Sequence, residues 1–208
     1  MILKGSQRGN AMELANHLLK ADENEHVEVH EIRGFMADDL HGAFKEIEAI
    51  SKGTRCKQFL FSLSLNPPQT ENVPIKYFEN ALTDIEKELG LEGQPRAVVF
   101  HEKEGRRHAH CVWSRINTEK MTAINLSHYK YKLRDISKQL YLKHGWQLPK
   151  GLMDSKKRDP RNFTLAEWQQ AKRMNEDPKT LKRNGVSTWP EATGADLWPS
   201  IIAEKCSL

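Results

Sequence analysis

Two strand-like segments joined by a short charged connection constrain the fold of this chain most strongly. Residues 96–101 and 107–116 are rich in apolar and β-branched residues, and only five residues separate them. Segments of this kind, joined so closely, pair as an antiparallel β-hairpin. The sequence therefore predicts a fold built on antiparallel strands.

Strand and helix patterns also alternate along the residues that precede the hairpin. Helical spacing of apolar residues predicts helices at 11–20, 38–51 and 74–89, and short apolar or alternating segments predict strands at 1–4, 26–32 and 59–65. Gly53 and Gly90 are placed to end two of the helices. In the segment 59–65 the odd positions are large and apolar, whereas Ser62 and Ser64 share the opposite face, so one face packs and the other can line a site.

The residues after the hairpin are more basic and, towards the end of the chain, less regular. An amphipathic helix is predicted at 127–144, and a second helix at 164–174, where Thr164 and Glu167 form a capping box. The order of elements predicts an α+β fold with a central, mostly antiparallel sheet of about five strands covered by helices. We expect a main domain at 1–150, a basic helical extension at 151–183 and a weakly structured tail at 184–208.

Charge is distributed unevenly along the 208 residues. The formal net charge is +4, but residues 1–100 carry −5 and residues 101–208 carry +9. A basic half favours a polyanionic partner, although a lysine-rich solvated surface explains the charge equally well. No segment has the apolar length of a membrane span, and three widely spaced cysteines fit reduced thiols, so we expect a cytoplasmic protein.

Three histidines on the hairpin form the main candidate site. His108 and His110 are two residues apart, so both side chains leave the same face of a strand. If the hairpin turns at 103–106, His101 lies opposite His108. Three imidazoles can bind a divalent metal and leave coordination positions open for a substrate or water. Isolated surface histidines are the alternative explanation, but it does not account for three that meet on one face.

The residues at this site resemble those of a known family. The run His101, six residues, His108-Ala109-His110 and then Trp113-Ser114-Arg115 is similar to the metal motif of relaxases, the mobilisation nucleases of conjugative plasmids, within the histidine–hydrophobic–histidine endonuclease superfamily. The resemblance extends from about residue 1 to about residue 175. One departure is Lys103, because many relaxases have an acidic residue there, and the neighbouring Glu102 or Glu104 could orient a ligand imidazole instead.

The resemblance implies a reaction, a cofactor and partners. A relaxase nicks single-stranded DNA at a plasmid transfer origin by metal-dependent transesterification and stays linked to the 5′ phosphate, with Mg²⁺ or Mn²⁺ stabilising charge on the phosphate. Accessory relaxosome proteins and a secretion-system coupling protein would be the partners, in a bacterial cytoplasm. The basic residues that we expect to contact DNA are Arg106, Arg107, Arg115, Lys130, Lys132 and Arg134.

The nucleophile is the main anomaly. Most relaxases of this kind use a tyrosine of the first helix as the nucleophile. In this chain, the position that resembles the family's tyrosine position is occupied by His17. A neutral imidazole is nucleophilic near pH 7 and would form a phosphoramidate. A replication initiator or transposase of the same superfamily would instead use Tyr129 or Tyr131. A third possibility is a non-catalytic DNA-binding protein that keeps the fold without a nucleophile.

Overall fold

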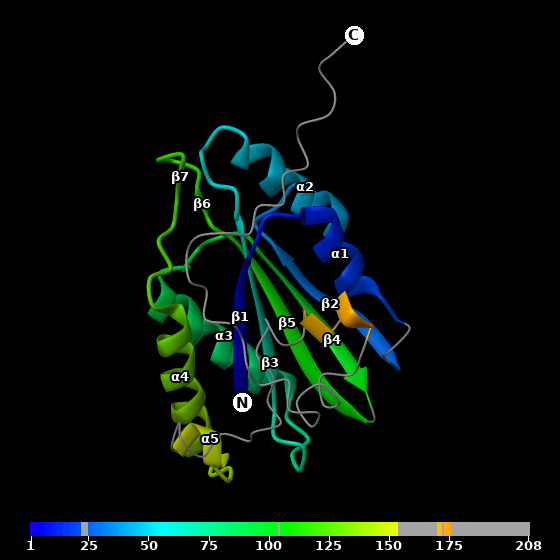
Figure 1. Ribbon diagram of the computed structural model, residues 1–208, viewed down its shortest axis with the longest axis vertical. Coiled ribbons are helices and arrows are strands. Elements are labelled where there is room, and N and C mark those ends of the chain that lie inside the picture. Colours follow the sequence, from blue (N-terminus) through cyan, green and yellow to red (C-terminus); the bar gives the residue numbers. More distant parts are fainter. Residues whose placement is uncertain (22–24, 104, 154–169, 172, 176–208) are drawn as a thin grey trace, which may run out of the picture. The chain divides into compact units, whose positions relative to one another are not determined.

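The structure, a computed structural model, is built around a five-stranded antiparallel sheet (Figure 1). It describes residues 1–21, 25–103, 105–153, 170–171 and 173–175. The strand order is β1-β3-β5-β4-β2. The five strands are β1 (Ile2–Arg8), β2 (His26–Arg33), β3 (Leu60–Asn66), β4 (Arg96–Lys103) and β5 (Arg106–Ser114).

Helices cover both faces of this sheet. On one face, α1 (Ala11–Leu19) and α2 (Leu40–Ser51) share a core cluster with Leu60, Val99 and Val112. On the other face, α3 (Ile75–Leu89) and α4 (Tyr129–Lys143) share a larger cluster with residues such as Phe61, Phe100 and Trp113. The α+β fold with about five mostly antiparallel strands is therefore confirmed.

Local sequence signals explain where the helices begin and end. The Asn10 side chain accepts a hydrogen bond from the backbone N–H of Glu13 and caps α1, and Asp39 does the same for Gly42 in α2. Gly90 ends α3 in the left-handed conformation, with φ of 67°. The predicted hairpin is β4 and β5, and its register pairs His101 with His108, as expected.

Three short elements were not predicted. Strands β6 (Ile116–Asn117) and β7 (Thr122–Ala123) form a separate two-stranded sheet, and α5 (Lys150–Met153) is a single turn. Elements of two to four residues are too short to show a periodicity. Strand β1 also extends to Arg8, four residues beyond the predicted segment, because its polar residues pair with β3 at the sheet edge.

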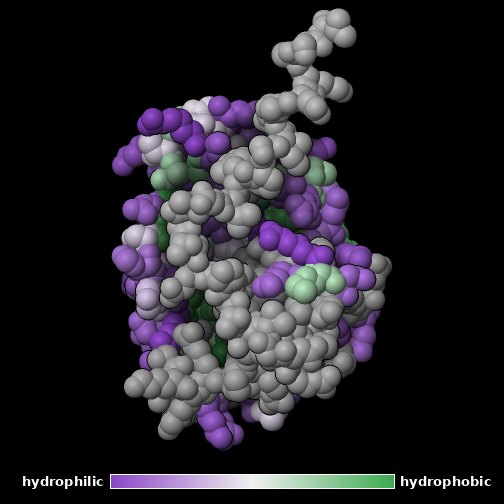
Figure 2. Space-filling view, in the orientation of Figure 1, coloured by the Kyte–Doolittle hydropathy of each residue, from purple (hydrophilic) through white to green (hydrophobic). Residues whose placement is uncertain are grey.

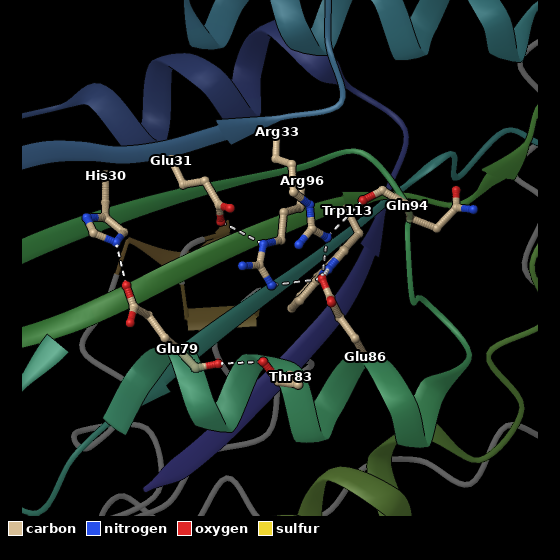
Figure 3. Close-up of polar contacts among 9 residues, drawn as sticks. All are labelled: His30, Glu31, Arg33, Glu79, Thr83, Glu86, Gln94, Arg96 and Trp113. Atoms are coloured by element: carbon tan, nitrogen blue, oxygen red, sulfur yellow. Dashed lines mark hydrogen bonds and ion pairs between the residues drawn. The ribbon is translucent and has the colours of Figure 1, made fainter. Parts of the chain in front are cut away.

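A buried ion network joins α3 to the sheet (Figure 3). Oε1 of Glu86 accepts hydrogen bonds from Arg33 and Arg96, both at 2.9 Å, and from the indole of Trp113 at 2.7 Å. Arg96 also donates to Glu31 at 2.7 Å. The carboxylate of Glu86 therefore balances two guanidinium groups from neighbouring strands.

The chain divides into two units, Met1–Met153 and Asp154–Leu208. Nearly all of the second unit lies outside the described residues. Most of the basic extension expected at 151–183, most of the 164–174 helix and the tail expected at 184–208 therefore lie outside them too. Among the residues described, no helix combines the length and apolar character needed to cross a membrane. The described surface in Figure 2 is mainly hydrophilic.

Candidate metal centre

The hairpin brings the three predicted histidines together on one face of the sheet. Their ring centroids are separated by 5.2 Å for His101 and His108, 4.7 Å for His101 and His110, and 5.3 Å for His108 and His110. One ring nitrogen from each residue lies within 4.8 Å of the other two. The alternation of a strand produces this arrangement, because positions 108 and 110 share a face and position 101 is the cross-strand neighbour of 108.

The face that carries the histidines is the one covered by α1 and α2. Val99 is two residues from His101 and Val112 is two residues from His110, so each valine shares a face of the sheet with its histidine. Both valines belong to the cluster packed under these helices. Nε2 of His101 lies 2.7 Å from the backbone carbonyl of Leu18, in the last turn of α1. Since a carbonyl can only accept, Nε2 carries the proton, and Nδ1 of His101 keeps its lone pair for a ligand.

Burial keeps the imidazoles neutral. It lowers the pKa of His110 to about 3 and that of His108 to about 4, with smaller contributions from neighbouring positive charges. The pKa of His101 is also lowered, mainly by burial. A neutral imidazole is the form that binds a metal, so the three rings are ready ligands at neutral pH.

The donor set fits a divalent ion with exchangeable positions. Three imidazole nitrogens suit a catalytic divalent transition metal better than a closed structural site, which would need a fourth protein ligand. The hydrogen bond from Nε2 of His101 to the Leu18 carbonyl is of the kind that commonly orients a metal-binding histidine through its other ring nitrogen. His101, His108 and His110 are therefore the residues that would hold the ion.

The predicted nucleophile lies on the helix that contacts this triad. His17 is exposed, in the last turn of α1, one residue before Leu18. Its charge contributes to the lowered pKa of both His101 and His110, so it is within electrostatic reach of both rings. The end of α1 therefore brings together the anchor of one ligand and a candidate attacking imidazole.

Glu102, one of the two carboxylates expected to orient a ligand, pairs with an arginine instead. Glu102 accepts hydrogen bonds from Nε and Nη2 of Arg107, at 3.0 and 2.6 Å. The group that contacts His101 is the Leu18 carbonyl, which sequence analysis missed because a backbone group leaves no signal in the sequence. Glu104 lies outside the described residues.

The residues predicted to bind DNA do not form one surface. Arg106 lies on the histidine face, whereas Arg107 pairs with Glu102. Arg115 is 8% exposed, and its guanidinium donates to the side chain of Gln7 and to two backbone carbonyls, so its hydrogen bonds serve the fold. The remaining three, Lys130, Lys132 and Arg134, belong to α4.

The two alternative nucleophiles also belong to α4. Tyr129 packs edge-to-face on Phe61, at 5.3 Å between ring centroids, within the cluster on the face opposite the histidines. Tyr131 is 69% exposed and its ring contacts His128. Neither tyrosine is in contact with the triad in the described part of the chain.

Comparison with known proteins agrees with this geometry. The family model described as relaxase, MobA/VirD2-like, nuclease domain matches residues 14–146. This range includes α1 from Leu14 onward, the hairpin with all three histidines, and α4. A search of the curated proteins found no match.

Proposed function

The chain belongs to the relaxase family through a MobA/VirD2-like nuclease domain, and we propose on this premise that it nicks single-stranded DNA at a plasmid transfer origin by transesterification. The family identifies a nuclease that binds and nicks DNA. The finer proposal concerns the strand, the attacking residue and the initiation of conjugative mobilisation. The observation that carries it is the convergence of three imidazoles, one of which is anchored by the Leu18 carbonyl of the helix that also carries His17.

The reaction that we propose exchanges one bond to phosphorus for another. A ring nitrogen of His17 attacks the scissile phosphate, a bond between nitrogen and phosphorus forms, and the bond to the 3′ oxygen breaks. The imidazole loses its N–H proton and the departing oxygen gains one, so a phosphoramidate and a free 3′ hydroxyl result. A divalent ion bound by the triad would stabilise negative charge on the phosphate oxygens.

The chain's own residues contribute position and protonation state. The Leu18 carbonyl holds the proton of His101 at Nε2, which keeps Nδ1 of that ring available as a ligand. Because α1 carries both Leu18 and His17, the carbonyl that anchors His101 and the attacking ring belong to the same helical turn. This connection supports His17 over Tyr129 and Tyr131, which lie on α4.

Transfer of a labelled oligonucleotide to the protein tests the proposal. The probe is single-stranded DNA that carries the transfer-origin region of a plasmid encoding the chain, with Mn²⁺ or Mg²⁺ present. We expect a covalent adduct that is lost in His17→Ala, retained in Tyr129→Phe and Tyr131→Phe, and abolished by EDTA or His110→Ala. Mass spectrometry of the attached peptide should identify His17.

The same assay separates the alternatives. An adduct that survives in His17→Ala and disappears in Tyr129→Phe or Tyr131→Phe would identify the initiator or transposase type of mechanism. Oligonucleotide binding with no adduct under any metal condition would identify a DNA-binding protein without catalysis.

A further inference from the structure

Two cations face each other at the tip of the β4–β5 hairpin, one step beyond the metal centre. The register pairs Lys103 with Arg106, just as it pairs His101 with His108. Since side chains two residues apart on a strand share a face, Lys103 and Arg106 lie on the face of the three histidines. The step along the strands is roughly 7 Å, which is of the order of the separation between neighbouring phosphates in a nucleic-acid backbone.

The described part of the chain gives neither cation a carboxylate partner. Lys103 is exposed and Arg106 is half-buried, and among the described residues neither has an ion pair with a carboxylate. Like charges placed directly opposite each other on adjacent strands destabilise a sheet. An anion held between the two side chains would relieve this repulsion.

The neighbouring charged pair on the hairpin behaves differently. Arg107 is directly opposite Glu102, and the two side chains form an ion pair at 2.6 Å. The Arg107 guanidinium also lies over the ring of Phe100, at 5.8 Å, on the face covered by α3. The hairpin therefore has a neutral pair on one face and a doubly positive pair on the face of the metal centre.

The doubly positive pair continues into the metal centre. The positive charges of Lys103 and Arg106 contribute to the lowered pKa of His108, so their fields reach this ligand. The pairing of β5 with β3 ends at Ala109. A small cleft opens beyond this residue and is lined by residues from both faces of the hairpin. Its lining residues are Asn66, Pro67, Pro68, Glu71, Arg106, Arg107 and His108, and the Glu71 carboxylate accepts a hydrogen bond from Thr70.

We infer that Lys103 and Arg106 form a phosphate subsite that holds a DNA backbone phosphate next to the one at the metal centre. The inference rests on the proposed function, because it takes single-stranded DNA as the ligand. Both residues act as positioning residues: they fix the register of the strand over the triad without contacting the reacting atoms. Contacts of this kind add affinity for any sequence.

The salt dependence of DNA binding tests this subsite. A fluorescein-labelled single-stranded oligonucleotide of mixed sequence is titrated with protein in EDTA at several KCl concentrations. For single strands, each phosphate contact contributes about 0.7 to the slope of log affinity against log salt. Because the pair holds one phosphate, we expect K103Q/R106Q to reduce the slope by about 0.7 and K103R/R106K to restore it.

A charge-matched variant provides the control. Lys76 and Lys87 are exposed on α3, which covers the opposite face, so K76Q/K87Q removes the same charge away from the subsite. We expect its slope to match that of the unmodified protein. Equal losses in both double variants, or no loss in K103Q/R106Q, would overturn the subsite.

The binding assay is independent of the proposed reaction, because EDTA removes the metal and no bond is broken. A protein that forms the covalent adduct but whose slope is unchanged in K103Q/R106Q would contradict the subsite alone. A protein that never forms the adduct but loses the slope would support the subsite and contradict the proposed reaction alone.

Discussion

His108 and His110 must remain uncharged in the folded protein, and this requirement makes stability depend on pH. Burial lowers the pKa of these residues to about 4 and about 3, whereas a histidine in the unfolded chain titrates near 6.5. As the pH falls below about 6.5, the unfolded chain therefore takes up protons that the folded protein resists. The free energy of unfolding of the metal-free protein should decrease as the pH falls from about 6.5 towards about 4.

Urea denaturation in EDTA at several pH values measures this effect. Carboxylates also titrate at the acidic end, so the comparison is with H108Q/H110Q, which keeps every carboxylate and removes the two imidazoles. We expect the variant to lose less stability than the unmodified protein between pH 7 and pH 5. Parallel pH profiles for the two proteins would show that the buried imidazoles do not carry the dependence.

Single residues also show how far the site could be predicted. The spacing of His101, His108 and His110 was sufficient to predict that the three side chains meet on one face, because strand alternation and hairpin register follow from sequence distance alone. The partner of His101 could not be predicted, because it is a backbone carbonyl from a helix 83 residues away. The same alternation could have separated Arg106 from Arg107, since adjacent residues of a strand face opposite sides.

Helix α3 depends on one buried carboxylate for its attachment to the sheet. Glu86→Ala would leave the guanidinium of Arg96, in a residue only 8% exposed, with Glu31 as its remaining partner, and would also remove the acceptor of the Trp113 indole. Breaking a buried ion pair by removing one partner typically costs at least about 3 kcal/mol. We expect Glu86→Ala to lower the free energy of unfolding by about that amount, measured by urea denaturation.

Glu88, on the same helix, provides a matched control. Its carboxylate is 54% exposed and lies 3.6 Å from the ammonium of Lys132. An exposed ion pair contributes less than about 1 kcal/mol, so Glu88→Ala should have a small effect. Similar losses for the two substitutions would contradict a special role for Glu86.

Helices and strands with strong local signals were predicted well. The limits of α1, α2 and α3 agree with the predicted ranges to within two residues, because capping residues and apolar periodicity lie in the elements themselves. The full length of β1 could not be predicted. Its second half, Gly5, Ser6, Gln7 and Arg8, has no apolar alternation that would predict a strand. These residues form a strand because they pair with β3, which is distant in the sequence.

At the scale of the whole molecule, the sheet separates the candidate site on one face from the larger apolar cluster on the other. The face under α1 and α2 carries the three histidines, Lys103 and Arg106, and α1 itself carries His17. The face under α3 and α4 holds the larger apolar cluster and the Glu86 network. From the sequence, the basic residues of the hairpin and of α4 were expected to contact DNA together. The two groups could not be assigned to different faces, because charge along a sequence does not reveal which face of the sheet a helix covers.

This division predicts that the first unit functions as a metal-binding domain by itself. Residues 1–153 contain both core clusters of the sheet, the triad and the whole family match. Residues 154–208 carry ten Lys and Arg against eight Asp and Glu, so their removal changes the formal net charge only from +4 to +2. A protein ending at Met153 should therefore unfold cooperatively and bind Mn²⁺ with unchanged affinity in calorimetric titration.

A second truncation shows whether the boundary itself matters. A protein that ends at residue 125 lacks α4 and would expose the cluster that Leu133, Ile136 and Leu140 cover. Loss of this packing should prevent cooperative unfolding, because one helix face of large buried side chains contributes several kcal/mol to a marginally stable domain. If the protein ending at Met153 also failed to unfold cooperatively, the first unit would need residues 154–208 for its stability. If it folded but no longer bound Mn²⁺, the centre would need a ligand from beyond Met153, and a site of three imidazoles alone would be wrong.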